Sequence, residues 1–106
     1  GEYHTMILKN DGSLWATGYN GSGQLGDGTN NIIRLTPVKV MGNVQSVSAG
    51  EYHTMILKND GSLWATGRNN LGQLGDGTNI NRSTPIKVME NVQSVSASYY
   101  HTMILH

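Results

Sequence analysis

Gly1–Gly18 reads GEYHTMILKNDGSLWATG, and Gly50–Gly67 repeats it letter for letter 49 residues later. The block GQLGDGTN also occurs twice, as Gly23–Asn30 and Gly72–Asn79. A third copy begins at Ser98 with SYYHTMIL. A period near 50 residues is typical of a propeller blade or of another repeat unit that stacks on its own copies.

These matches divide the 106-residue chain, taken as a single unit over 1–106, into three parts. Repeat 1 covers about 1–49, repeat 2 covers about 50–97, and the start of repeat 3 covers 98–106. The near-identity of the copies indicates either a recent duplication or a designed repetition.

Four strand candidates follow one another in each repeat, and no segment has helical periodicity. In the order of the chain they are Val44–Ala49, His53–Lys58, Ser62–Thr66 and Thr84–Met89. Asn59-Asp60-Gly61 predicts a hairpin turn between the second and third strands. We therefore predict an all-β fold of four-stranded antiparallel blades, two blades per chain.

The order of the strands within a blade follows from crowding. Val44–Ala49 is rich in small residues, which suit the narrow centre of a ring. The fourth strand of repeat 1 carries Pro37 and Lys39, which protect an exposed sheet edge against pairing. We expect a meander that runs from VQSVSA at the centre through HTMILK and SLWAT to the Pro-containing strand at the outside.

Composition argues against several classes of function. Lys plus Arg and Asp plus Glu number 7 each, so the chain lacks the basic excess of a nucleic-acid-binding protein. It has no cysteine, and its purely aliphatic runs, such as Met55-Ile56-Leu57, are too short to span a bilayer. We expect no nucleic-acid partner and no membrane association.

The pattern G-x-x-H-T-x-x-L-x-x-D-G-x-L-W-x-x-G-x-N-x-x-G-Q-L-G-x-G, followed by Pro and V-x-x-V-x-A, resembles the regulator of chromosome condensation repeat. The resemblance covers the whole chain and implies a four-stranded blade in a ring, which has seven blades in the parent members of the family. Thr17 and Thr66 depart from the pattern, because the family often has a second Trp there. The matching positions of repeat 1 are His4, Asp11, Gly12, Gly18, Asn20, Gly23, Gln24, Leu25, Gly26, Gly28 and Pro37.

No catalytic, cofactor-binding or metal site is predicted. Gly21–Gly26 matches G-x-G-x-x-G, but no helix follows to bind a pyrophosphate. The equivalent His4, His53 and His101 could form a ring of imidazoles around a metal. We instead expect each imidazole to form a hydrogen bond to the backbone of its own blade. We expect no enzymatic activity.

A candidate protein-binding rim follows from the positions at which the two copies differ, which gather in the long loop between the third and fourth strands. Drift in an unconstrained loop is the alternative explanation of the same differences. The rim comprises Tyr19, Asn20, Ser22, Arg68, Asn69 and Leu71.

The function predicted first is a non-enzymatic propeller scaffold or protein-interaction module that closes a ring with copies of itself. Two blades per chain require an even number of blades, and six and eight lie nearest to the family's seven. Of the corresponding trimer and tetramer, we expect the tetramer. Val92–Ala97 of a neighbour could supply the inner strand that precedes the HTMIL strand of repeat 1. The closure strands contain Tyr3, His4, Met6, Leu8, Val92, Val95, Ala97, Tyr100, Met103 and Leu105.

Two alternatives remain open. The near-perfect repetition, the absent initial Met and the end inside a strand are also expected of an engineered or excised propeller fragment with no function of its own. The family resemblance implies protein binding of the nucleotide-exchange or inhibitor type. Exchange in the family uses an inserted hairpin, and no such insertion occurs between the repeats here.

Overall fold

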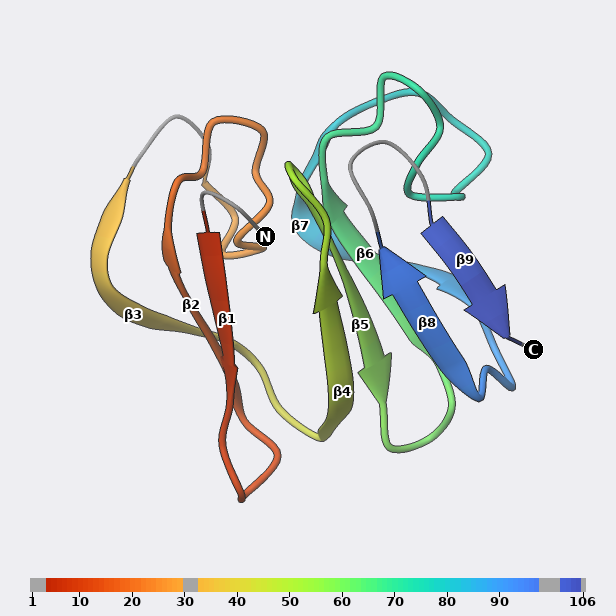
Figure 1. Cartoon of the computed structure of the whole chain (residues 1–106), viewed down its shortest axis with the longest axis horizontal. Helices are drawn as coiled ribbons and strands as arrows, with labels where there is room; N and C mark the ends of the chain where they lie inside the picture. The colour runs from red at the N-terminus through yellow and green to blue at the C-terminus, as the bar shows by residue number, and fades with distance from the viewer. Residues whose placement is uncertain (1–3, 30–32, 98–101, 106) are drawn as a thin grey trace.

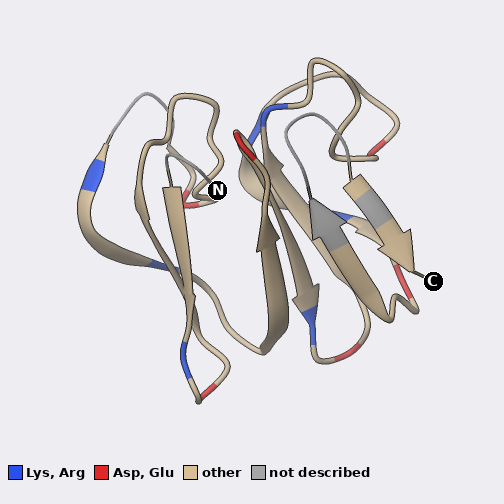
Figure 2. Cartoon of the chain, in the orientation of Figure 1, with Lys and Arg blue, Asp and Glu red and all other residues tan. Residues whose placement is uncertain are grey.

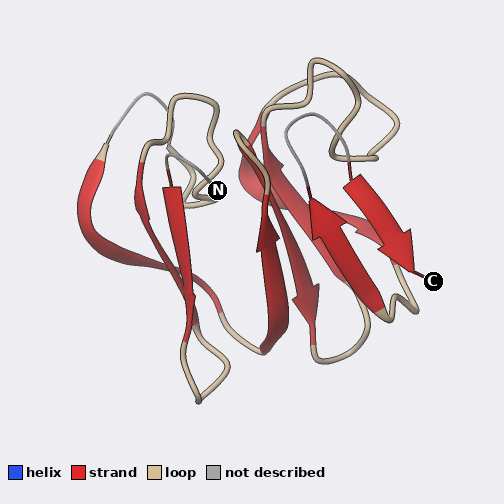
Figure 3. Cartoon of the chain, in the orientation of Figure 1, coloured by secondary structure: helices blue, strands red, loops and turns tan. Residues whose placement is uncertain are grey.

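In the computed structural model, residues 4–29, 33–97 and 102–105 are described. They form antiparallel strands joined by turns and loops, and no helix occurs among them (Figure 1, Figure 3). The all-β prediction is confirmed. Its physical basis is the short apolar segments, each ended by Gly, Asn or Asp before a helical face could form.

The strands form three sheets that stand side by side (Figure 1). The first has the order β1 (His4–Leu8), β2 (Leu14–Gly18), β3 (Arg34–Met41). The second has the order β4 (Val44–Ala49), β5 (His53–Lys58), β6 (Leu63–Gly67), β7 (Arg82–Met89). The third pairs β8 (Ser94–Ala97) with β9 (Thr102–Leu105).

The order β4-β5-β6-β7 is the meander expected from the sequence, with the Pro-containing strand outermost. Three boundaries differ from the prediction. The third strand begins at Leu63 and ends at Gly67, each one residue late, and the fourth begins at Arg82, two residues early. The early start arises because a register shift between Ala65 and Gly67 brings Arg82 opposite Gly67. Such a bulge extends pairing beyond the apolar pattern that predicted the strand.

The core lies between the sheets. One buried cluster packs Leu14 of β2 against Val44 and Ile56 of the second sheet. The other contains Met55 and Leu57 of β5, together with residues of β6, of the loop that follows β6 and of the β7–β8 turn. β5 is therefore buried on both faces, which explains why HTMILK lacks the alternation of a half-exposed strand.

A blade does not coincide with a sequence repeat. The complete sheet takes β4 from the end of repeat 1 and β5 to β7 from repeat 2. β8 and β9 reproduce the pairing of β4 and β5, since Ala97 faces Thr102 as Ala49 faces Thr54. Among the described residues, no strand pairs with the free edge of β1.

The structure describes most, but not all, of the residues that the sequence predicted as closure strands. Val92 is buried and Val95 packs against the same cluster, so the inner strand of the third sheet is already covered within the chain. Ala97 and Met103 belong to β8 and β9, which pair with each other. Tyr3 and Tyr100 lie outside the described residues.

The charged residues are spread over strands, turns and loops, with both signs mixed (Figure 2). Within the part of the chain that the structure describes, no helix has the length and apolar character needed to cross a membrane.

Candidate functional site

The GQLGDG loop is organised by one buried asparagine in each copy. The Asn69 side-chain oxygen accepts from the Leu74 backbone N–H at 3.0 Å. Its amide nitrogen donates to Asp76 Oδ1 at 2.9 Å and to the Ile80 carbonyl at 3.0 Å. Asn20 repeats the first contact with Leu25 N at 3.1 Å. This explains why the loop has a defined conformation although it contains no regular structure.

A buried carboxylate completes the same loop. Asp76 accepts from Thr78 Oγ1 at 2.7 Å and from Arg82 Nε at 3.0 Å. Burial alone would raise the pKa of Asp76, but the hydrogen bonds from Thr78 and Asn69 and the Arg82 contact lower it to about 2. Asp27 and Arg34 form the equivalent ion pair at 2.9 Å. The carboxylates therefore stay ionised and hold the loop to the outer strand.

The loop of the first blade also binds the second blade. The Thr66 hydroxyl of β6 donates to the Gly23 carbonyl at 2.7 Å, and the Thr54 hydroxyl of β5 donates to the Gln24 carbonyl at 2.7 Å. Gly28 N donates to the Ser83 carbonyl of β7 at 2.9 Å. One loop thus contacts three strands of the next blade, and we call residues 23–28 the clasp.

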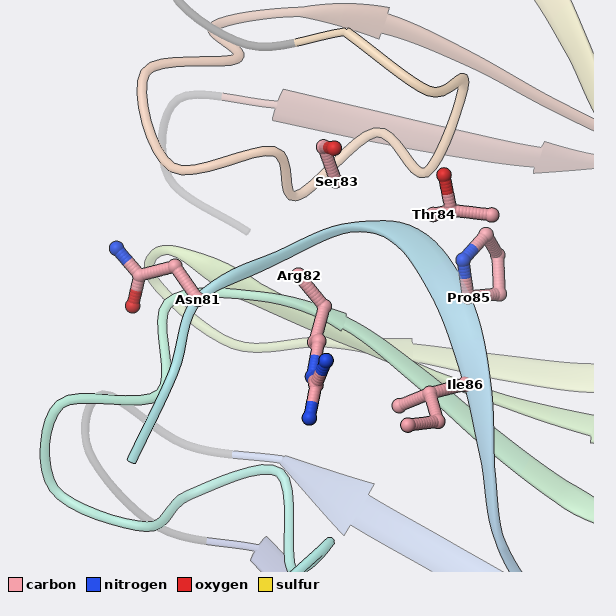
Figure 4. A pocket seen from close by; sticks show the side chains of 6 residues that line it. All are labelled: Asn81, Arg82, Ser83, Thr84, Pro85 and Ile86. Carbon is pink, nitrogen blue, oxygen red and sulfur yellow. The ribbon is translucent and has the colours of Figure 1, made fainter. Parts of the chain in front are cut away.

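A hollow of about 400 Å³ lies along β7 beside the clasp (Figure 4). Ser83 and Thr84 lie next to the first-blade loop that crosses this strand (Figure 4). The hollow is therefore part of the seam between two blades and carries no cluster of reactive side chains. It is lined by Asn81, Arg82, Ser83, Thr84, Pro85 and Ile86.

The expectation for His4 is wrong, and His101 lies outside the described residues. His4 Nε2 bonds Thr54 Oγ1 of the next blade at 2.9 Å and not the backbone of its own blade. Because the single Thr54 hydroxyl hydrogen is donated to Gln24, His4 must donate from a neutral imidazole that carries its hydrogen on Nε2. His53 and Thr102 form the same pair at 3.1 Å. The sequence did not reveal that β1 faces a threonine of the following blade.

This contact gives a prediction for the pH dependence of stability. Burial lowers the pKa of His4 from its ordinary value of 6.5 to about 4. The unfolded chain therefore binds more protons between these values, and stability falls as the pH falls through this window. We expect about 2 kcal/mol less free energy of unfolding at pH 5 than at pH 7.

Denaturant titrations at fixed protein concentration measure this difference. The carboxylate Asp76 does not contribute in this window, because it titrates from its ordinary value downward. His4→Gln should flatten the profile between pH 4 and 6.5. A profile as steep in the variant as in the original chain would contradict the assignment to His4.

The loops at the top of Figure 1, residues 19–29, 50–52 and 68–81, form the upper rim. Tyr52 lies between the two blades there: its ring meets Tyr19 edge-on at 6.0 Å between centroids. The Arg68 guanidinium also lies 5.5 Å from the centroid of the Tyr52 ring. Gly21 permits this cluster, because a Cβ at that position would overlap the Tyr19 hydroxyl. The long loop between the third and fourth strands and the loop that carries Tyr52 thus share this rim.

The rim residues predicted from sequence divide into two groups. Tyr19 is 41% exposed, Leu71 is 63% exposed, and Ser22 and Arg68 are half-buried. Asn20 and Asn69 are completely buried, which corrects their assignment as contact residues: their amides are used to hold the loops. Sequence reasoning missed Thr54 and Thr66 as contacts between blades. Their signal was a hydroxyl within an otherwise apolar strand, identical in both copies.

Among the described residues, no group of three or more His, Cys, Asp or Glu side chains is placed to hold a metal ion. The residues that sequence analysis compared with a nucleotide loop, Gly21–Gly26, belong to the clasp and to the turn before it. The clasp therefore binds one blade to the next.

Four-stranded antiparallel meanders that pack face to face, with small residues on the inner strand, define the blades of a β-propeller. The Regulator of chromosome condensation (RCC1) repeat model matches residues 11–57 and 60–105. A second model of the same repeat matches residues 44–73. The chain belongs to the RCC1 repeat family.

Solved structures agree on the fold. Human WBSCR16 is similar over 100% of this chain and 29% of its own, with TM-score 0.90 and 23% identity. Prp20p from Saccharomyces cerevisiae is similar over 98% of this chain and 29% of its own, with TM-score 0.88 and 21% identity. A chain in the structure of Kap60 bound to yeast RCC1 (Prp20) gives TM-score 0.83 and 28% identity, covering 98% and 28%. This chain spans less than a third of these proteins.

Proposed function

We propose that the chain is a non-enzymatic propeller scaffold that associates with copies of itself through the outer faces of its blades. The main observation in support of self-association is that identical residues differ in burial between the two copies. Ile56 and Leu57 are 0% and 1% exposed, whereas Ile7 and Leu8 are 38% and 37% exposed. The same strand sequence is thus a core strand in one blade and a surface strand in the other.

Covering these side chains favours association, because burying apolar surface contributes about 25 cal/mol per Å². For the 106-residue chain in solution, another copy offers blades of the same shape. A ring of such copies has an even number of blades, and we retain the tetramer ahead of the trimer. The lack of a catalytic motif in the sequence supports a role in binding and not in turnover.

Native mass tests this proposal. Light scattering or sedimentation from low to high micromolar concentration should give a mass several times 11.5 kDa, with four copies expected. The closed ring would keep one mass over the upper part of this range. A chain that stays near 11.5 kDa throughout would contradict the self-association, and a continuously growing mass would contradict closure.

A second candidate function is the binding of another protein at the upper rim. The observation that favours it is the cluster of Tyr19, Tyr52 and Arg68, which spans two blades. Tyr19 and Arg68 occupy equivalent positions at which the two copies differ. Tyr and Arg are the residues that most often dominate binding energy at protein interfaces. Prp20p has binding properties to Gsp1p and histones, so we take these two as the first partners to test.

The double variant Tyr19→Ala, Arg68→Ala should weaken the binding of such a partner about tenfold or more. Calorimetry or biolayer interferometry with histones and with Gsp1p measures the effect. The control is Glu90→Ala on the opposite rim, where Glu90 contacts only exposed Lys87 at 2.8 Å among the described residues. Binding that is lost in the control and kept in the double variant would place the site on the opposite rim.

A further inference from the structure

The second copy of the clasp, residues 72–77, has only part of its partner within the chain. Thr102 of β9 donates to the Gln73 carbonyl at 2.7 Å, as Thr54 donates to Gln24 in the first copy. The contacts that Gly23 and Gly28 make to β6 and β7 have no counterpart at Gly72 and Gly77 among the described residues.

The space beside the second clasp is correspondingly open. At Gly23 an added Cβ would lie 2.6 Å from Ser83 Cα, because β7 passes directly over it. At Gly72 and Gly77 no atom of the described part of the chain lies within 4 Å of that position. The second clasp has the conformation of the first, with φ of +74° at Gly72 against +79° at Gly23.

The first sheet has the shape of the missing partner. β1, β2 and β3 pair in the same register as β5, β6 and β7, and Gly18 faces Arg34 as Gly67 faces Arg82. Thr17 Oγ1 lies 2.8 Å from the Arg34 carbonyl oxygen, as Thr66 Oγ1 lies 2.8 Å from the Arg82 carbonyl oxygen. The first sheet of a second copy therefore presents to the second clasp the same groups that the second sheet presents to the first.

Thr5 and Ile7 of β1 are exposed and lie on the face of the first sheet that this docking requires. Thr54, Ile56 and Thr66, which are fully buried, belong to the face of the second sheet that meets the first blade. Their equivalents are Thr5 and Ile7, which are exposed, and Thr17, which is half-buried. Continuity with the interface inside the chain thus identifies the occupant as the β1-β2-β3 sheet of a second copy.

This placement brings two identical segments into competition. Thr102–Leu105 and Thr5–Leu8 both read TMIL, and both fit beside β8. The Gln73 carbonyl accepts from Thr102 in the isolated chain and would accept from Thr5 in the assembly. Both strands cannot occupy one place.

We propose that clasp 72–77 is the docking site for the β1-β2-β3 sheet of a second copy, whose β1 replaces β9 beside β8. The completed blade then consists of β8 from one copy and three strands from the next. This inference rests on the self-association proposed above and specifies its interface.

Two threonine variants of the full chain test the strand exchange. Thr5→Val removes a hydroxyl that is exposed in the isolated chain, and should weaken association about tenfold per interface. Thr102→Val removes only the hydrogen bonds that connect β9 to the Gln73 carbonyl and to His53, so the association of the copies should be unchanged or stronger. Sedimentation over a concentration series measures both. No effect of Thr5→Val, or weakening by Thr102→Val, would overturn the exchange.

The clasp itself is tested by Gly72→Asn, since asparagine tolerates a positive φ but adds a side chain where the incoming strand must pass. Association should fall roughly ten- to hundredfold. The matched control is Gly61→Asn, at φ +85°, where the nearest atoms lie at an ordinary 3.7 Å. A Gly72→Asn chain that assembles like the control would overturn the docking site. A monomeric original chain would instead overturn the self-association.

Discussion

Replacing Gly67 by alanine is expected to lower the free energy of unfolding by about 4 kcal/mol. Gly67 ends β6 with φ of +112°, a conformation that costs an L-residue about 1–2 kcal/mol. An added Cβ would also lie 2.5 Å from the Tyr52 carbonyl oxygen and 2.8 Å from His53 Cα. These are backbone atoms of the paired strand, so they cannot move aside without opening the β5–β6 ladder.

Gly61→Ala is the matched control for this substitution. Gly61 also has a positive φ, +85°, but its nearest neighbours are Asn91 backbone atoms at 3.7 Å. The control retains the conformational penalty and lacks the overlap, so its cost should be about 1–2 kcal/mol. Denaturant unfolding at one protein concentration compares the two. Equal costs would show that the close approach at Gly67 relaxes at little expense.

Asn69→Ala is expected to cost roughly 3–4 kcal/mol, because it leaves one buried backbone N–H and two part-buried carbonyls without this partner. The Leu74 N–H loses its acceptor, and the Ile80 and Thr78 carbonyls lose a donor. Asp76 loses one of the hydrogen bonds that keep its pKa low. We expect the 69–81 loop to become a site of proteolytic cleavage before the sheets unfold.

Asn70→Ala provides the neighbouring control. Asn70 is exposed and its side chain accepts only from Arg68 Nε, at 3.1 Å, among the described contacts. Its removal should change stability by about 0.5 kcal/mol or less. Urea titration gives the free energies, and limited proteolysis followed by mass spectrometry locates the cut. Cleavage elsewhere, or a loss below 1 kcal/mol for Asn69→Ala, would show that the loop does not depend on this amide.

The fold could be predicted in detail because local chemistry and repetition agree. The turn at Asn59-Asp60-Gly61, the small residues of Val44–Ala49 and the Pro85 strand each indicate one place in a meander, and the observed order matches. The strand ends were predicted less well. Pairing of Arg82 with Gly67 depends on a bulge, and a bulge changes the register without changing the apolar pattern.

The candidate site could be predicted only as a location. Variation between the copies indicated the long loop, and the structure places exposed Tyr19 and Leu71 there. It also shows that Asn20 and Asn69 are completely buried. A short polar side chain in a glycine-rich loop is equally suited to a surface contact and to internal hydrogen bonds. The difference depends on where the loop backbone folds over it.

The sequence by itself determined the class of fold and the order of strands within a blade. These follow from turn residues, residue size and an exact repeat, which act over a few residues or along the chain. Only the tertiary structure decided what each repeated residue does. His4 reaches Thr54 of the next blade, and Ile7 is exposed where the identical Ile56 is buried. Burial and partnership depend on the neighbouring sheet, and two copies of one sequence have different neighbours.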